Sequence, residues 1–158
     1  MKTKLCLILL ANFVTFGCVR PAHFYPVQGP LSSQTPLPVA TAKISYGLNL
    51  KQLSVVLSSG EVCKGAWTEV PMGQVPGRSD SQNVGLQPEW DAVYGSGFYV
   101  SHVMGARFYA RATATGDRGT VLNVEIYHPE NAKGGNVIAT VKGVARDNKD
   151  NVYKLVLE

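Results

Sequence analysis

The stretch that decides the fold is FYARATATGDRGTVLNVEI, residues 108–126. Small or apolar side chains stand at every second position on both sides of its centre, Thr115-Gly116-Asp117-Arg118-Gly119. A period of two is typical of strands that bury one face. A centre rich in Gly and Asp is typical of a hairpin loop. These residues therefore predict two antiparallel strands joined by a tight turn.

The same period recurs on both sides of this hairpin, in the runs 43–50, 52–58, 137–141 and 153–157. Turn signals separate the runs, at Ser58-Ser59-Gly60 and at Asp147-Asn148-Lys149-Asp150-Asn151. No helical crossover is indicated between them. We therefore predict an all-β domain of about seven to eight short antiparallel strands, built as a small sandwich or barrel.

Composition and charge limit the classes of protein to consider. The chain has 158 residues, of which 16% are charged and 45% hydrophobic, which favours one folded domain over a disordered chain. The net charge of +4 includes Lys2 and Lys4; without them, 13 basic residues face 11 acidic ones. An excess this small gives no reason to expect nucleic-acid binding.

The first seventeen residues are typical of an export signal. Lys2 and Lys4 precede an apolar run over 5–16, which is too short to cross ~30 Å of hydrocarbon as a helix. The stretch VTFGC, residues 14–18, resembles the lipobox of bacterial lipoproteins. The resemblance implies that residues 1–17 are a lipoprotein signal peptide and that Cys18 is the lipid attachment site, carrying acyl chains such as palmitate. Ordinary signal cleavage after Gly17 is the alternative.

Location follows from the same resemblance. In such lipoproteins an Asp after the acylated cysteine retains the protein in the inner membrane, and this chain has Val19 there. The resemblance therefore implies anchoring in the bacterial outer membrane, on its periplasmic face. Of the other cysteines, Cys6 would leave with the signal peptide, so Cys63 would be the single thiol of a mature domain without an internal disulfide.

Residues 18–40 are rich in proline, with Pro21, Pro26, Pro30, Pro36 and Pro38. Proline removes a backbone donor and fixes φ, so this stretch predicts an extended tether that reaches up to roughly 70 Å and leaves residues 41–158 as the β domain. The alternative is that residues 23–27, with adjacent Phe24 and Tyr25, pack back on the domain as an ordered arm.

Candidate catalytic residues are few. Cys63 and His102, oriented by Asp91 or Asp117, would supply a thiol nucleophile and a base if the fold brought them together. A small residue facing the interior of a sheet is the ordinary role for Cys63. We therefore do not expect an enzyme. No spacing of His and Cys indicates a metal site, and no motif indicates a cofactor.

Candidate ligand contacts lie on one strand and in two loops. Arg107, Tyr109 and Arg111 alternate with apolar residues, and such a stripe suits phosphate, carboxylate or sugar groups. The favoured alternative is that an arginine of this strand pairs with Glu125 across the hairpin. The proline-rich and glycine-rich stretches 71–89 and 128–135 are expected to be loops, where ligand contacts concentrate.

Several stretches together resemble a set of small, uncharacterised bacterial envelope lipoproteins: 25–30, 60–67, 115–120 and 147–155. This resemblance supplies a location and an architecture but no activity, cofactor or catalytic residue. We expect a binding or structural module of the cell envelope, held to the membrane by its N-terminal lipid and contacting an envelope protein or glycan. An envelope enzyme that uses its long loops, and an exclusion lipoprotein that blocks a foreign protein, are the alternatives.

Overall fold

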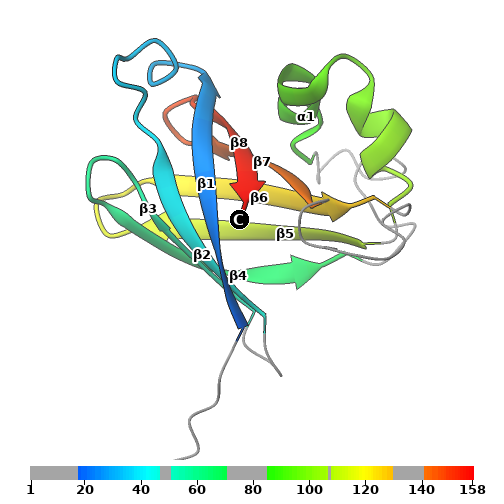
Figure 1. Cartoon of the computed structure of the whole chain (residues 1–158), viewed down its shortest axis with the longest axis horizontal. Helices are drawn as coiled ribbons and strands as arrows, with labels where there is room; N and C mark the ends of the chain where they lie inside the picture. The colour runs from blue at the N-terminus through cyan, green and yellow to red at the C-terminus, as the bar shows by residue number, and fades with distance from the viewer. Residues whose placement is uncertain (1–17, 47–50, 71–84, 107, 130–140) are drawn as a thin grey trace, which may run out of the picture.

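The computed structural model describes residues 18–46, 51–70, 85–106, 108–129 and 141–158. These residues form a closed antiparallel barrel in which each strand pairs with the next and the last pairs with the first (Figure 1). The all-β prediction is confirmed, in its barrel form. The strands are β1 (Cys18–Gln28), β2 (Ala40–Tyr46), β3 (Gln52–Val56), β4 (Val62–Glu69), β5 (Phe108–Gly116), β6 (Val121–His128), β7 (Lys142–Asp147) and β8 (Val152–Leu157).

The predicted hairpin is the pair β5–β6. Ala112 stands opposite Val124, and the turn between the strands closes through a hydrogen bond from Gly116 N to Thr120 O. Three inward positions of β5, 110, 112 and 114, are alanines, whereas those of β6 are Leu122, Val124 and Ile126, and all six are buried. Small side chains on β5 thus leave interior space beside the larger side chains of the neighbouring strand β6.

The expected tether is wrong, because β1 is a full strand of the barrel. It pairs with β2 from Cys18 to Phe24 and with β8 from Ala22 to Gln28. The side chains of Ala22 and Phe24 are 1% and 0% exposed. Residues 18–28 therefore belong to the barrel. The alternative of an ordered N-terminal segment is closer to the structure: Phe24 is buried, whereas Tyr25 and Val27 are 36% and 44% exposed.

The prolines of β1 stand where the strand needs few backbone donors. Pro21 precedes the pairing with β8, and Pro26 lies beyond the pairing with β2, next to a register shift in the β8 ladder. Proline in a sheet is tolerated at edges and bulges, where its missing N–H breaks no ladder hydrogen bond. The proline count therefore indicated a tether wrongly.

A helical segment lies outside the barrel. Of the expected loop 71–89, residues 71–84 lie outside the described residues, but the helix α1 (Gln87–Tyr94) begins within the rest. Pro88 stands in its first turn, where a missing N–H costs nothing. The short π-helix η1 (Tyr99–Val103) follows α1. No helix among the described residues is long and apolar enough to span a membrane.

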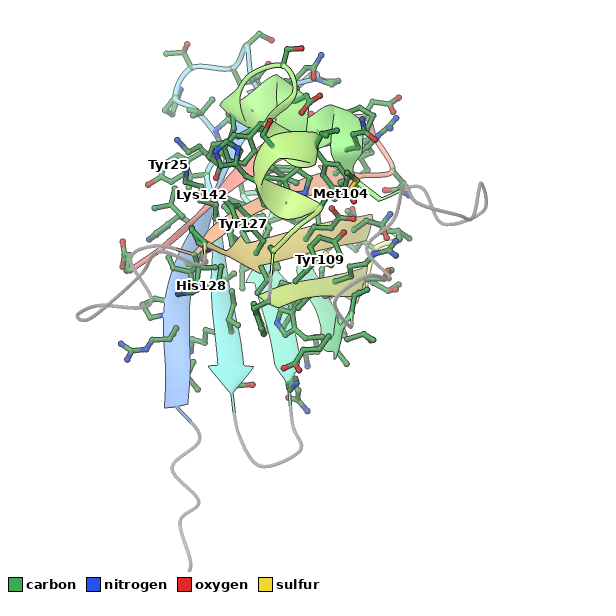
Figure 2. The ribbon with its side chains drawn as sticks, turned by 90° about the vertical axis from the view of Figure 1, so that its right-hand side faces the viewer. Tyr25, Met104, Tyr109, Tyr127, His128 and Lys142 are labelled. Carbon is green, nitrogen blue, oxygen red and sulfur yellow. The ribbon has the colours of Figure 1, made fainter. Side chains whose placement is uncertain are left out.

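The two helices build a second apolar cluster on the outer wall of the barrel. Trp90, Tyr99 and Val103 of the helices pack there with strand residues whose side chains point outward: Tyr109, Tyr127 and Val144. Figure 2 shows the helical segment lying across the strands that carry Tyr109 and Tyr127. The outer face of β5 to β7 is therefore partly buried, not solvated.

The barrel has two distinct ends. The Cys18 end holds the start of β1, the end of β2 and the start of β3. The turn end holds the end of β1 together with the turns 57–61, 117–120 and 148–151. The turn predicted at 147–151 is thus confirmed as the connection between β7 and β8.

Candidate functional site

The candidate site is a polar groove at the turn end, which we call the Arg146 groove. It consists of two cavities of about 420 and 480 Å³ that share Pro88, Glu89, Arg146 and Asp150. The first is completed by Gly85, Leu86, Val121, Asn123, Asp147 and Asn148, and the second by Gln28, Gly29 and Val152. The groove thus joins the start of α1 to the ends of four strands.

Arg146 bridges two acidic residues from different elements. Its Nη1 lies 3.1 Å from Oε1 of Glu89 in α1, and its Nη2 lies 2.7 Å from Oδ1 of Asp150 in the β7–β8 turn. The Glu89 side chain is 5% exposed and that of Asp150 is 80% exposed. The hydrogen bond with Asp150, followed by the charge of Glu89, raises the pKa of Arg146. The guanidinium group therefore ties the helix to the barrel and lies between the two cavities.

The floor of the groove is fixed by the buried carboxylate of Asp147. Its Oδ1 accepts hydrogen bonds from Lys149 N and Asn151 N, at 2.8 and 2.9 Å. Its Oδ2 accepts from Asn151 Nδ2 at 2.9 Å and from the Tyr153 hydroxyl at 2.8 Å. Four donors satisfy this carboxylate, so it holds the turn in place and has little capacity left for a ligand.

Charge in the groove is predominantly negative. Three carboxylates line it against one guanidinium group, and side-chain amides add further acceptors and donors. Such a lining suits a ligand or partner that brings positive charge or hydrogen-bond donors. Within the described ranges, no group of three or more His, Cys, Asp and Glu side chains is arranged to hold a metal ion.

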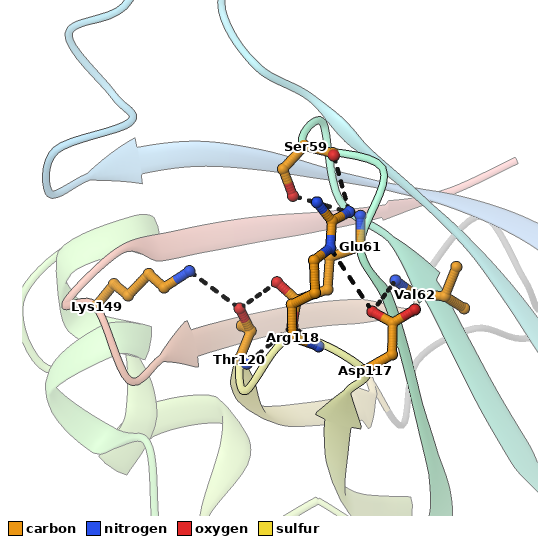
Figure 3. A network of polar contacts seen from close by, with 7 residues as sticks. All are labelled: Ser59, Glu61, Val62, Asp117, Arg118, Thr120 and Lys149. Atoms are coloured by element: carbon orange, nitrogen blue, oxygen red, sulfur yellow. Dashed lines mark hydrogen bonds and ion pairs between the residues drawn. The ribbon is translucent and has the colours of Figure 1, made fainter.

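A second polar network closes the same end of the barrel (Figure 3). Glu61 accepts hydrogen bonds from Thr120 Oγ1 at 2.7 Å, Thr120 N at 2.9 Å and Arg118 N at 3.1 Å. The bond from the Thr120 hydroxyl is the largest cause that lowers the pKa of Glu61. Lys149 Nζ donates to the same hydroxyl at 3.2 Å. The turns 117–120 and 148–151 are thereby joined to Glu61 beside β4.

The predicted stripe of Arg107, Tyr109 and Arg111 is not an exposed surface. Tyr109 is 1% exposed beneath the helical segment, and Arg107 lies outside the described residues. Arg111 stands opposite Glu125, with its Nε 3.6 Å from Glu125 Oε1. The predicted cross-strand pair is confirmed. The period of two placed Tyr109 on the outer face correctly, but it could not reveal that a helix covers that face.

The buried carboxylate of Glu125 fastens the helical segment to the barrel. Its Oε1 accepts from Leu86 N and its Oε2 accepts from the Trp90 indole N–H, both at 2.8 Å. Burial, and then the charge of Glu125, raise the pKa of Tyr109. Glu125 is 2% exposed, so water has little access to these two hydrogen bonds.

The structure does not bring Cys63 and His102 together. Cys63 lies inside the barrel with no exposed surface, and burial is the main cause that raises the pKa of its thiol. His102 lies outside on η1, exposed, with its ring stacked on Phe98 at a centroid distance of 4.4 Å. The barrel wall separates the two side chains, so they cannot act as nucleophile and base.

The sequence pattern pointed to one side of the Arg146 groove, through the stretch 71–89, but not to Arg146, Asp150 or the strand residues that complete it. The one local signal was Pro88-Glu89, a proline followed by an acid, which is typical of the first turn of a helix. The described part of the expected loop, 85–89, does line the groove. Most of the stretch 128–135, where contacts were also expected, lies outside the described residues.

No family model matches the chain, and no curated protein or solved structure is similar to it at a significant level.

Proposed function

We propose that this protein is a lipid-anchored binding module of the bacterial cell envelope. Export removes residues 1–17, acyl chains including palmitate are attached to Cys18, and the barrel is held at the periplasmic face of the outer membrane. The amino-acid pattern of residues 2–18 is the basis for export and acylation. The barrel contributes the binding surface, at the Arg146 groove.

One observation carries this proposal: Cys18 and the groove stand at opposite ends of the same strand. β1 begins at Cys18, and Gln28 at its other end lines the groove. Eleven residues of strand span roughly 33 Å between first and last Cα. An anchor at Cys18 therefore leaves the groove open toward the envelope space, and confinement near one membrane raises its effective concentration for partners there.

The chemistry of the groove favours a protein partner over a glycan. Its carboxylates, Glu89 and Asp150 in particular, are already engaged with Arg146, so a neutral sugar would have to compete with a charged hydrogen bond. A lysine or arginine side chain of a partner would instead place a second positive charge beside the carboxylates of Glu89 and Asp150. We therefore propose a basic segment of an envelope protein as the partner.

Replacing the acylation site tests the anchor. Cys18→Ala is expected to move the protein from the membrane fraction to the soluble fraction, or to leave the precursor uncleaved, because no thiol remains for lipid attachment. Fractionation and mass spectrometry of the N-terminus measure both results. Val19→Ala is the matched control and should stay membrane-bound. Normal processing and full membrane retention of Cys18→Ala would refute acylation.

Photo-crosslinking tests the binding surface. A photoreactive residue at Gln28, which is exposed in the groove, is expected to give a discrete adduct with an envelope protein in intact cells. The control is the same residue at exposed Lys64 on β4, outside the groove. Asp150→Asn should weaken the Gln28 adduct by removing one negative charge. Equal adducts from both positions, or none from Gln28, would count against the groove.

A further inference from the structure

We propose that the barrel sits directly on the bilayer, with its Cys18 end in the lipid headgroup layer and its turn end facing away. The partner of this surface is the lipid headgroups themselves. This inference rests on the proposed acylation of Cys18, and it adds the orientation and the contact surface.

The argument starts from the absence of free chain between the acylation site and the fold. Cys18 is the first residue of β1 and stands opposite Tyr46 in the β1–β2 ladder. The next residue, Val19, stands opposite Ser45, and Ser45 in turn stands opposite Gln52 of β3. A tether would have let the domain move tens of ångströms from the membrane. A strand paired from its first residue allows no such movement.

The dimensions of a bilayer then place the end of the barrel. The headgroup region adds ~5–7 Å to each side of the hydrocarbon core. The acyl chains on Cys18 must lie in that core, so the Cα of Cys18 is held close to it. Strands rise ~3.3 Å per residue and lie ~4.8 Å apart, so Val19 and Arg20, with Ser45 beside them, fall within the headgroup layer.

The side chains at this end suit that layer. Val19 is 51% exposed although it is apolar, and Arg20 and Lys43 are exposed basic residues. Basic side chains at a membrane surface can contact lipid phosphates while their apolar stems lie against the interface.

Two acidic side chains among the described residues near this end have a partner. Glu69 pairs with Lys51. Glu158 lies with its Oε1 2.9 Å from Nε2 of His23. The positive charge of Lys51 reduces the repulsion that the Glu69 carboxylate would meet at an anionic headgroup surface.

The test measures the depth of two labelled positions. The full chain, with native acylation and with Cys63→Ala to remove the other thiol, carries a fluorescent label through Gln52→Cys or Ser58→Cys. Both positions are exposed. Gln52 is the first residue of β3 and Ser58 lies in the turn beyond the other end of β3, so the two are on the order of 20 Å apart. Each protein is reconstituted into phosphatidylethanolamine and phosphatidylglycerol vesicles that contain a headgroup spin-labelled lipid.

We expect several-fold stronger quenching of the label at position 52 than at position 58. Inserting a flexible Gly-Ser segment between Cys18 and Val19 is expected to reduce the quenching at position 52. Acylated protein with equal, weak quenching at both positions would overturn the seating and leave the anchor intact. Protein whose N-terminal mass shows no lipid would overturn the proposed acylation, and the seating with it.

Discussion

Replacing Gly65 with alanine is expected to cost at least about 3 kcal/mol of stability, at the upper end of what overpacking costs. Gly65 stands in β4 between Leu53 of β3 and Ala114 of β5. A Cβ there would lie 2.8 Å from the carbonyl carbon of Thr113 and 2.9 Å from the Cα of Ala114. The clash is with backbone, so no change of side-chain rotamer relieves it, and β4 and β5 would have to separate.

Urea unfolding followed by tryptophan fluorescence measures this cost. The matched control is Gly105→Ala, because a Cβ at Gly105 meets no atom within 4 Å. This control should change stability by no more than about 0.5 kcal/mol. Similar unfolding midpoints for the two variants would mean that β4 and β5 can separate at no cost, contrary to the close approach described above.

The second large effect is expected from replacing Glu125 with alanine. This substitution should lower the free energy of unfolding by about 3 kcal/mol, near the lower end of the range for breaking a buried ion pair. The substitution leaves the Trp90 indole N–H and the Leu86 N–H without their acceptor, and it removes the carboxylate that lies 3.6 Å from Nε of Arg111. The Arg111 side chain is 30% exposed, so water offsets part of the loss.

Without the Glu125 carboxylate, the helical segment should also detach from the barrel, because two of its hydrogen bonds to β6 are lost. Hydrogen exchange of the Trp90 indole N–H is therefore expected to accelerate in Glu125→Ala before global unfolding. Glu158→Ala is the control, because its side chain is 59% exposed and surface ion pairs contribute no more than about 1 kcal/mol. If the free energy of unfolding fell by the same small amount in both variants, Glu125 would not be the attachment point of α1.

Much of the barrel could be predicted because its signals are local. The alternation in residues 108–126 identifies both strands of the β5–β6 hairpin, and Asp147 to Asn151 marks the turn that the structure confirms. The pairing of Arg111 with Glu125 followed from the register of that hairpin. In each case the deciding residues lie close together along the chain, so propensity and spacing are sufficient.

The errors arose where distant segments meet. The prolines of β1 indicated an unpaired chain, because a pattern of prolines does not show which backbone donors a partner strand leaves unused. The helix α1 was missed because eight residues carry a weak periodic signal, and its attachment depends on Glu125, 35 residues from Trp90. The Arg146 groove combines residues from Gln28 to Val152, which no local pattern relates.

The sequence by itself determined that the chain is built from short antiparallel strands, because period-two alternation and turn residues act over a few positions. It also predicts export and acylation at Cys18. Only the tertiary structure decided that the first strand closes the barrel against the last, that a helix buries Tyr109, and that Arg146 joins Glu89 to Asp150. Those features depend on contacts between residues far apart in the chain, whose cost in chain entropy is met only when the whole barrel forms.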